Sequence, residues 1–195
     1  LCQLDSIYLF HLSNYNKLLL QRNRLLKDYG FYPEAGTMLD VIDEQLIQYG
    51  TALIRSRRAF TDQLQEIIGG IHSSLSGRKE DLTVTYEPNA EETEFGQKLQ
   101  ENREKDLRMK QTMTGPHRDD LGFAVHGVDL RKYGSQGQQR TTALSLKLAE
   151  IEIVKQSVKD TPVLLLDDVL SELDGSRQRY LLENIHDIQT MITCT

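Results

Sequence analysis

The sequence is poor in the features that mark several classes of protein. It has two cysteines among 195 residues, Cys2 and Cys194, without the clustered spacing of a disulfide scaffold or a zinc site. Its 4 prolines and 13 glycines exclude collagen-like and low-complexity chains. No apolar run approaches the roughly 18 residues that span a bilayer, and residues 1–5 lack the charged-then-apolar order of a secretory signal. These absences predict a globular, cytoplasmic protein without a membrane segment.

The charge balance is acidic, with 23 Lys and Arg against 29 Asp and Glu and a formal charge of −6. Hydrophobic residues make up 38% and charged residues 27%, which suits one full domain or two small ones. An acidic total disfavours a protein coated in nucleic-acid-binding charge, but it is compatible with a local basic strip. The net charge therefore neither supports nor excludes DNA binding.

Apolar residues recur every three or four positions in the front half of the chain. The first such segment, residues 4–27, is ended by Gly30 and Pro33. The second, residues 39–71, predicts a single helix far longer than the mean of about 11–12 residues. We interpret the apolar stripe as core packing between two long antiparallel helices rather than as a cofactor site. Residues 1–80 are thus predicted to form a helical arm, and residues 81–195 a second domain.

Five arginines concentrate positive charge on the arm: Arg22, Arg24, Arg55, Arg57 and Arg58. A solvated helix face explains most of them, and contact with phosphate groups is the alternative. Beyond the arm, we expect a strand over residues 82–86, a largely exposed and highly charged helix within residues 91–113, and a second strand over residues 121–128.

The tripeptide His117-Arg118-Asp119 matches the start of a protein-kinase catalytic loop. A kinase needs Asn five residues after the Asp, where this chain has Ala124, and no Asp-Phe-Gly follows. We therefore exclude a kinase and expect a hydrogen-bonded structural corner, with a nucleotide or DNA contact as the alternative.

The apolar run of residues 163–166 predicts a strand buried on both faces of a parallel sheet, with Asp167 and Asp168 directly at its carboxyl end. In open α/β sheets, ligands bind at that edge. One carboxylate there can hold Mg²⁺ through water and nucleotide phosphates, and a second can accept a proton from an attacking water. This is the Walker B pattern, although a strand that ends in acidic residues also occurs at helix caps and turns.

A second motif begins the helix expected over residues 141–158. Ser135 and Gly137 precede it, and they present a hydroxyl group and backbone N–H groups at the positive end of the helix dipole, which suits a γ-phosphate. The alternative is an ordinary serine N-cap. After the two aspartates, a helix over residues 175–188 and a parallel strand over residues 191–195 are expected.

Three ordered segments resemble the carboxy-terminal ATPase lobe of the ABC/SMC superfamily, and most closely the RecF family. They are Thr114-Gly115-Pro116-His117-Arg118-Asp119-Asp120-Leu121, Tyr133-Gly134-Ser135-Gln136-Gly137-Gln138-Gln139-Arg140-Thr141 and Leu166-Asp167-Asp168-Val169-Leu170-Ser171-Glu172-Leu173-Asp174. The helical front half resembles the RecF arm, so that the resemblance covers essentially the whole chain. It implies an α/β fold, namely the carboxy-terminal part of a P-loop ATPase lobe with a parallel sheet and an antiparallel helical arm.

The resemblance also implies roles for individual residues. Ser135, Gly137 and Gln138 would belong to the signature motif, which touches ATP held by a second subunit. Asp167 would carry the Mg²⁺ site. Asp168 would replace the catalytic glutamate of most relatives and give slow turnover. Ser171 and Asp174 would belong to the D-loop at the dimer interface, and Thr193 lies where transporter relatives place a switch histidine.

The sequence contains no Gly-x-x-x-x-Gly-Lys-[Ser/Thr] loop, which RecF-like proteins carry on an amino-terminal lobe. We therefore expect this chain alone to lack ATPase activity. By resemblance, the intact protein would be a weak ATPase that dimerises with ATP, binds DNA near single-strand/double-strand junctions, and helps RecO and RecR to load RecA. The alternatives are another SMC- or ABC-type ATPase and a non-catalytic helical interaction module.

Overall fold

The computed structural model describes the chain except residues 159–162, 168–169, 171–172, 186 and 194–195. The chain forms two compact units: residues 1–60 with 86–121, and residues 61–85 with 122–195. Helix α2 and strands β1 and β2 pass from one unit into the other. The predicted division at residue 80 stays a prediction.

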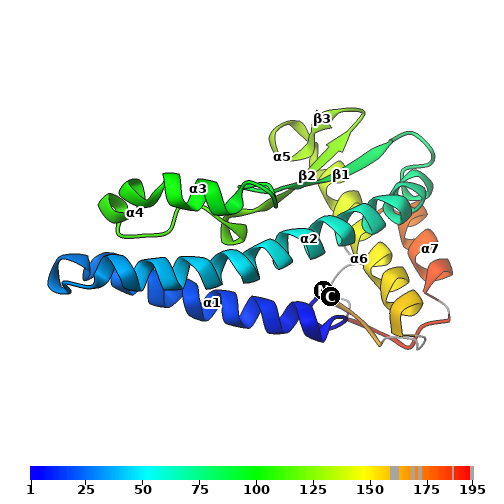
Figure 1. Ribbon diagram of the computed structural model, residues 1–195. Helices are drawn as coiled ribbons and strands as arrows, with labels where there is room; N and C mark the ends of the chain where they lie inside the picture. Colours follow the sequence, from blue (N-terminus) through cyan, green and yellow to red (C-terminus); the bar gives the residue numbers. More distant parts are fainter. Residues whose placement is uncertain (159–162, 168–169, 171–172, 186, 194–195) are drawn as a thin grey trace. The chain divides into compact units, whose positions relative to one another are not determined.

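Two long helices dominate the front half, as predicted. Helix α1 spans Ser6–Lys27, and α2 spans Ala35–Leu75, a length of 41 residues. Asp5 caps α1, since its carboxylate accepts hydrogen bonds from the N–H groups of Ile7 and Tyr8 at 2.8 and 3.0 Å. A short 3₁₀ helix, Tyr29–Phe31, connects the two helices, which run side by side in the first unit (Figure 1).

The apolar stripe forms the core of the first unit, as predicted. Its buried members are Tyr8, Tyr15, Leu18, Leu46, Leu53, Ile54, Ala90, Phe95 and Leu99. The largely exposed helix expected over residues 91–113 is wrong in two respects. It is two short helices, α3 (Phe95–Glu101) and α4 (Arg103–Met109), and the side chains of Phe95 and Leu99 are fully buried. Although the segment is highly charged, its apolar residues Phe95 and Leu99 are four positions apart and therefore share one helical face.

The arginines of the arm do not share one environment. Arg22 is fully buried, which corrects the solvated-face interpretation at this position, whereas Arg55 is exposed and pairs with Glu92. Arg22 Nε donates to Asp43 at 2.5 Å and Nη1 donates to Asp106 at 2.7 Å, so the buried charge has two carboxylate partners. Arg57 is also largely buried, and it pairs with Asp119 at 2.8 Å.

In the part of the chain that the structure describes, one sheet has the strand order β1-β2-β3. Strand β1 is Leu82–Glu87, as expected. The second expected strand, residues 121–128, is wrong at its end, because β2 (Asp120–Val125) turns back antiparallel into β3 (Val128–Asp129). The turn residues His126 and Gly127 both have positive φ, the combination that a tight type I′ hairpin turn requires.

The second unit contains helices α5 (Leu130–Tyr133), α6 (Gln136–Val158) and α7 (Gly175–Asn184). Strands β4 (Leu164–Asp167) and β5 (Thr190–Thr193) pair in parallel, as expected. A core of described apolar residues packs around them: Leu75, Leu144, Leu148, Leu166, Leu173, Leu181, Ile185 and Ile188. Burial of β4 on both faces is a wrong prediction. Leu165 is 70% exposed, and its register partner Met191 is 64% exposed, because the described pair of strands has an uncovered apolar face.

Candidate functional site

The structure places Asp167 at the carboxyl end of β4, as the Walker B interpretation requires. Its register partner in the parallel strand is Thr193. The Thr193 hydroxyl donates to Asp167 Oδ1 at 2.5 Å, so a neutral donor orients the carboxylate. Asp167 is exposed at this edge. Asp168, the predicted catalytic residue, lies outside the described residues.

The described surroundings of Asp167 are compatible with Mg²⁺ bound through one carboxylate. Among the described residues, no three His, Cys, Asp or Glu side chains gather closely enough to hold a metal ion. Mg²⁺ usually keeps several waters and binds through one or two carboxylates plus substrate phosphates. A single exposed carboxylate at a strand end is a suitable donor for that mode of binding.

The predicted signature residues form one turn at the start of α6. Ser135 Oγ accepts from the Gln138 N–H at 3.2 Å, and Gln138 Oε1 accepts from the Ser135 N–H at 2.9 Å. This reciprocal pair is a capping box. Gly137 lies inside the turn, where N–H groups of the first helical turn have no intrahelical acceptor. The helix therefore begins at Gln136, five residues earlier than predicted, and Ser135 is exposed.

The Gln138 side chain is held from its other end as well. Its Nε2 donates to Glu80 Oε1 at 3.0 Å, and Glu80 Oε2 lies 3.1 Å from His72 Nε2. His72 Nδ1 in turn lies 3.0 Å from the Ser145 hydroxyl on α6. Burial lowers the pKa of His72, although Glu80 acts in the opposite direction. Neither Glu80 nor His72 was predicted from the sequence, since 58 positions separate Glu80 from Gln138 and no local spacing connects them.

Asp174 caps α7. Its Oδ1 accepts from the N–H groups of Ser176 and Arg177, both at 3.0 Å, and Oδ2 pairs with Arg177 Nη1 at 2.8 Å. The hydrogen bond from the Arg177 N–H, together with the Arg177 charge, lowers the pKa of Asp174 below its usual value. Asp174 borders a hollow of about 600 Å³ that Lys79 and Arg179 also line. The other predicted D-loop residue, Ser171, lies outside the described residues.

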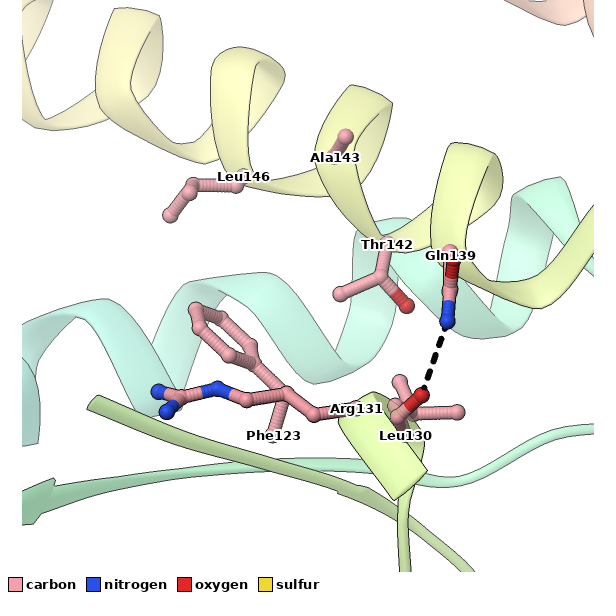
Figure 2. A pocket seen from close by; sticks show the side chains of 7 residues that line it. All are labelled: Phe123, Leu130, Arg131, Gln139, Thr142, Ala143 and Leu146. Carbon is pink, nitrogen blue, oxygen red and sulfur yellow. Dashed lines mark hydrogen bonds between the residues drawn. The ribbon is translucent and has the colours of Figure 1, made fainter. Parts of the chain in front are cut away.

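A second hollow, of about 440 Å³, lies beside the Ser135 turn in the second unit (Figure 2). Its lining is mainly apolar and comes from β2, α5 and α6: Phe123, Leu130, Arg131, Gln139, Thr142, Ala143 and Leu146. Gln139 Nε2 donates to the carbonyl oxygen of Leu130 at 3.1 Å across its edge. The sequence analysis did not predict this hollow.

The sequence-predicted residues thus fall into separate groups. Ser135, Gly137 and Gln138 share one turn, and Asp167 lies with Thr193 at the edge of the parallel strands. Among the described residues, no hydrogen bond or ion pair joins the Ser135 turn to Asp167.

The His117-Arg118-Asp119 segment is a structural corner, as expected. His117 Nε2 donates to the Thr112 carbonyl oxygen at 3.0 Å, so Nδ1 accepts from the Tyr15 hydroxyl at 2.7 Å. Asp119 accepts from Arg57, from the Tyr86 hydroxyl and from the Asn89 N–H. Burial lowers the pKa of His117, which favours the neutral ring in which Nδ1 accepts.

Fold and site together define an α/β protein with an antiparallel helical arm and a carboxylate at the edge of a parallel strand pair. The predicted fold class is therefore confirmed. No protein-family model matches the chain. The chain is 58% identical over 195 residues to the DNA replication and repair protein RecF of Agathobacter rectalis, which covers all of this chain and 54% of that protein. The RecF protein of Halalkalibacterium halodurans is 47% identical over 204 residues, covering 99% of this chain and 55% of that protein.

A solved structure, described as the recombination mediator protein RecF with ATP in the RecFOR pathway, has the same fold with a TM-score of 0.88. It is 34% identical and covers 98% of this chain and 54% of that chain. The chain belongs to the RecF family. It spans about half the length of the curated relatives it matches. Among the described helices, none is long and apolar enough to cross a membrane.

Proposed function

We propose that this chain is the part of a RecF-type DNA repair protein that completes an ATP site between two copies. The observation that carries the proposal is the similarity over 98% of the chain, at a TM-score of 0.88, to a RecF protein solved with ATP. The positions of Asp167 at a strand end and of Ser135 at the start of a helix support it, since both are places where phosphates and their cations bind.

Asp167 would hold the Mg²⁺ ion, which neutralises phosphate charge when it is bound. Ser135 uses its Oγ as an acceptor for the Gln138 N–H, which leaves the hydroxyl proton available to a phosphate oxygen. The N–H groups of the first turn of α6 that have no intrahelical acceptor, at Gly137 among others, would add donors at the positive end of the helix dipole. Asp174 and Ser171 would contact the second copy, and Asp168 would act as the general base.

In the intact protein, we propose that ATP closes a dimer on DNA near single-strand/double-strand junctions and that hydrolysis opens it. Partners would be RecO and RecR, with RecA loading at gaps as the outcome. The naming of the solved relative after the RecFOR pathway supports this assignment. The site of action would be the cytoplasm, where DNA is repaired.

Sedimentation velocity of the full-length protein with and without Mg·ATP tests the proposal. We expect ATP to shift the wild-type protein from monomer to dimer, and Ser135→Ala to remain monomeric at the same ATP concentration. Ser74→Ala, an exposed serine on α2, is the matched control and should dimerise like the wild type. A wild-type protein that sediments identically with and without ATP would contradict the proposal.

A further inference from the structure

Four side chains connect the end of α2 to the Ser135 turn. His72 lies in the last turns of α2 and is fully buried, and Glu80 follows in the segment that leads into β1. Glu80 bridges His72 and Gln138 with its two oxygens, at 3.1 and 3.0 Å. On the other side of the imidazole ring, His72 Nδ1 lies 3.0 Å from Ser145 Oγ on α6. All of these residues lie in the second compact unit.

When His72 is neutral, the available donors and acceptors determine the direction of the hydrogen bonds between these side chains. The Glu80 carboxylate only accepts, so it receives one hydrogen from Gln138 Nε2 and one from His72 Nε2. The Nδ1 atom is then an acceptor that faces the Ser145 hydroxyl, and it competes for the single hydroxyl hydrogen with the Thr141 carbonyl oxygen, to which Ser145 donates at 2.7 Å. Besides Glu80, the charged groups that act on His72 are Asp81 and the Arg177 guanidinium on α7.

Two hydrogen bonds therefore hold the Gln138 amide in one orientation. Its oxygen accepts from the Ser135 N–H at 2.9 Å and its nitrogen donates to Glu80, so that a flip of the amide would break both bonds. The next residue, Gln139, donates from Nε2 to the carbonyl oxygen of Leu130 at 3.1 Å (Figure 2) and to that of Gly134 at 3.4 Å. The backbone of the turn is thus held on both sides before any nucleotide binds, which reduces the ordering cost of binding.

We propose that Glu80 and His72 are positioning residues that hold Gln138, and with it the Ser135 turn, in the conformation that meets the nucleotide of a second copy. This inference rests on the proposed function. Glu80 is the central member, because it contacts Gln138 directly and is anchored in turn by a fully buried imidazole ring. The path also links the end of the arm helix α2 to the turn, so that a displacement of that end would reach the ATP contact.

The test compares Glu80→Ala with Glu87→Ala in the full-length protein. Glu87 is an exposed carboxylate at the end of β1, the strand that follows Glu80, and it serves as the matched control. Loss of a hydrogen bond to a charged group should raise the ATP concentration for half-maximal dimerisation about tenfold in Glu80→Ala. ATP affinity at protein concentrations where the chain is monomeric should not change, since the turn would contact only the nucleotide of the other copy. A merely structural role would not separate these two quantities.

Two further variants keep the proposal falsifiable if Glu80→Ala does not fold. Glu80→Gln retains an oxygen for Gln138, and its N–H group can donate to His72 Nε2 when the ring takes the tautomer protonated at Nδ1, so it should restore dimerisation to within about threefold of wild type. Glu80→Asp keeps the charge but shortens the reach by one methylene, so it should weaken dimerisation in the same direction as Glu80→Ala. In a Gln138→Ala background, Glu80→Ala should have no additional effect, since the path is already broken.

The outcomes separate the two proposals. If the wild type dimerises with ATP and Ser135→Ala does not, but Glu80→Ala and Glu80→Asp both behave like Glu87→Ala, the positioning role is overturned and the proposed function stands. An additional effect of Glu80→Ala in the Gln138→Ala background would also overturn it. If the wild type does not dimerise with ATP, both proposals fail.

Discussion

At the scale of single residues, the buried charge of Arg22 is the strongest constraint on the first unit. Its guanidinium group has two carboxylate partners and the Thr112 hydroxyl, and Asp106 is itself fully buried. Asp106 also accepts from the Met113 N–H at 2.9 Å, so it ties the segment after α4 to α1. Removing one partner of such a group leaves charge in a site that water does not reach.

We predict that Asp106→Ala lowers the free energy of unfolding by about 3 kcal/mol, because it leaves Arg22 with a single carboxylate partner in the core. Urea unfolding followed by circular dichroism measures this change. Glu104→Ala, an exposed carboxylate on the same helix, is the control and should change stability by less than about 0.5 kcal/mol. Equal effects of the two substitutions would contradict the account.

The two buried histidines predict a pH dependence of stability. Burial lowers the pKa values of both His72 and His117 below the usual 6.5. The unfolded chain therefore binds protons at a higher pH than the folded chain, and stability is lost as the pH falls below about 6.5 toward the folded pKa values. We expect a lower melting temperature at pH 5.5 than at pH 7.5, with a smaller difference in His117→Gln. A melting temperature that is unchanged or higher at pH 5.5 would refute this expectation.

At the scale of elements, the packing of α3 on α2 depends on a glycine. A methyl group added at Gly50 would overlap the Phe95 ring and press on Tyr15. Both aromatic side chains are buried in the core of the first unit, so neither can move away into solvent. The glycine is thus required by the close approach of an aromatic ring to the helix.

Gly50→Ala should destabilise the protein by about 1–3 kcal/mol, the usual effect of overpacking a core. Gly70→Ala is the matched control, because Gly70 lies in the same helix with no atom within 4 Å of an added methyl group. That substitution should instead stabilise the protein by about 0.5–1 kcal/mol, because alanine loses less conformational freedom in a helix. Opposite signs in thermal unfolding are the expected result, and equal signs would count against the packing argument.

The elements that the sequence predicts well are those with long-range periodicity. The 3.6-residue repeat identified α1 and α2, and a strand that ends in aspartate identified β4. The predictions were wrong where a turn of a few residues or a single tertiary contact determined the structure. The turn that ends β2 has positive φ angles at His126 and Gly127, and the sequence His-Gly is a weaker signal for such a turn than Asn-Gly. The burial of Phe95 depends on a partner helix far along the chain.

At the scale of the whole molecule, the candidate site could be predicted only in its separate parts. Motif order placed Ser135 at the start of a helix and Asp167 at the end of a strand, and the structure agrees with both placements. The support behind the turn could not be predicted, because Glu80 and His72 reach it through tertiary contacts. The proposed convergence of Ser135 of one copy with Asp167 of another stays a prediction.

Subunit mixing tests that convergence most directly. Ser135→Ala and Asp167→Asn variants of the full-length protein are each expected to lack ATP hydrolysis, since every site of such a dimer has one defective half. A mixed dimer holds one intact site, built from Asp167 of the first variant and Ser135 of the second. At protein and ATP concentrations high enough for both variants to pair at random, an equimolar mixture should therefore recover up to about a quarter of the wild-type rate, because half of the dimers are mixed and each has one intact site of two. A mixture that is as inactive as its components would contradict a site shared between two copies.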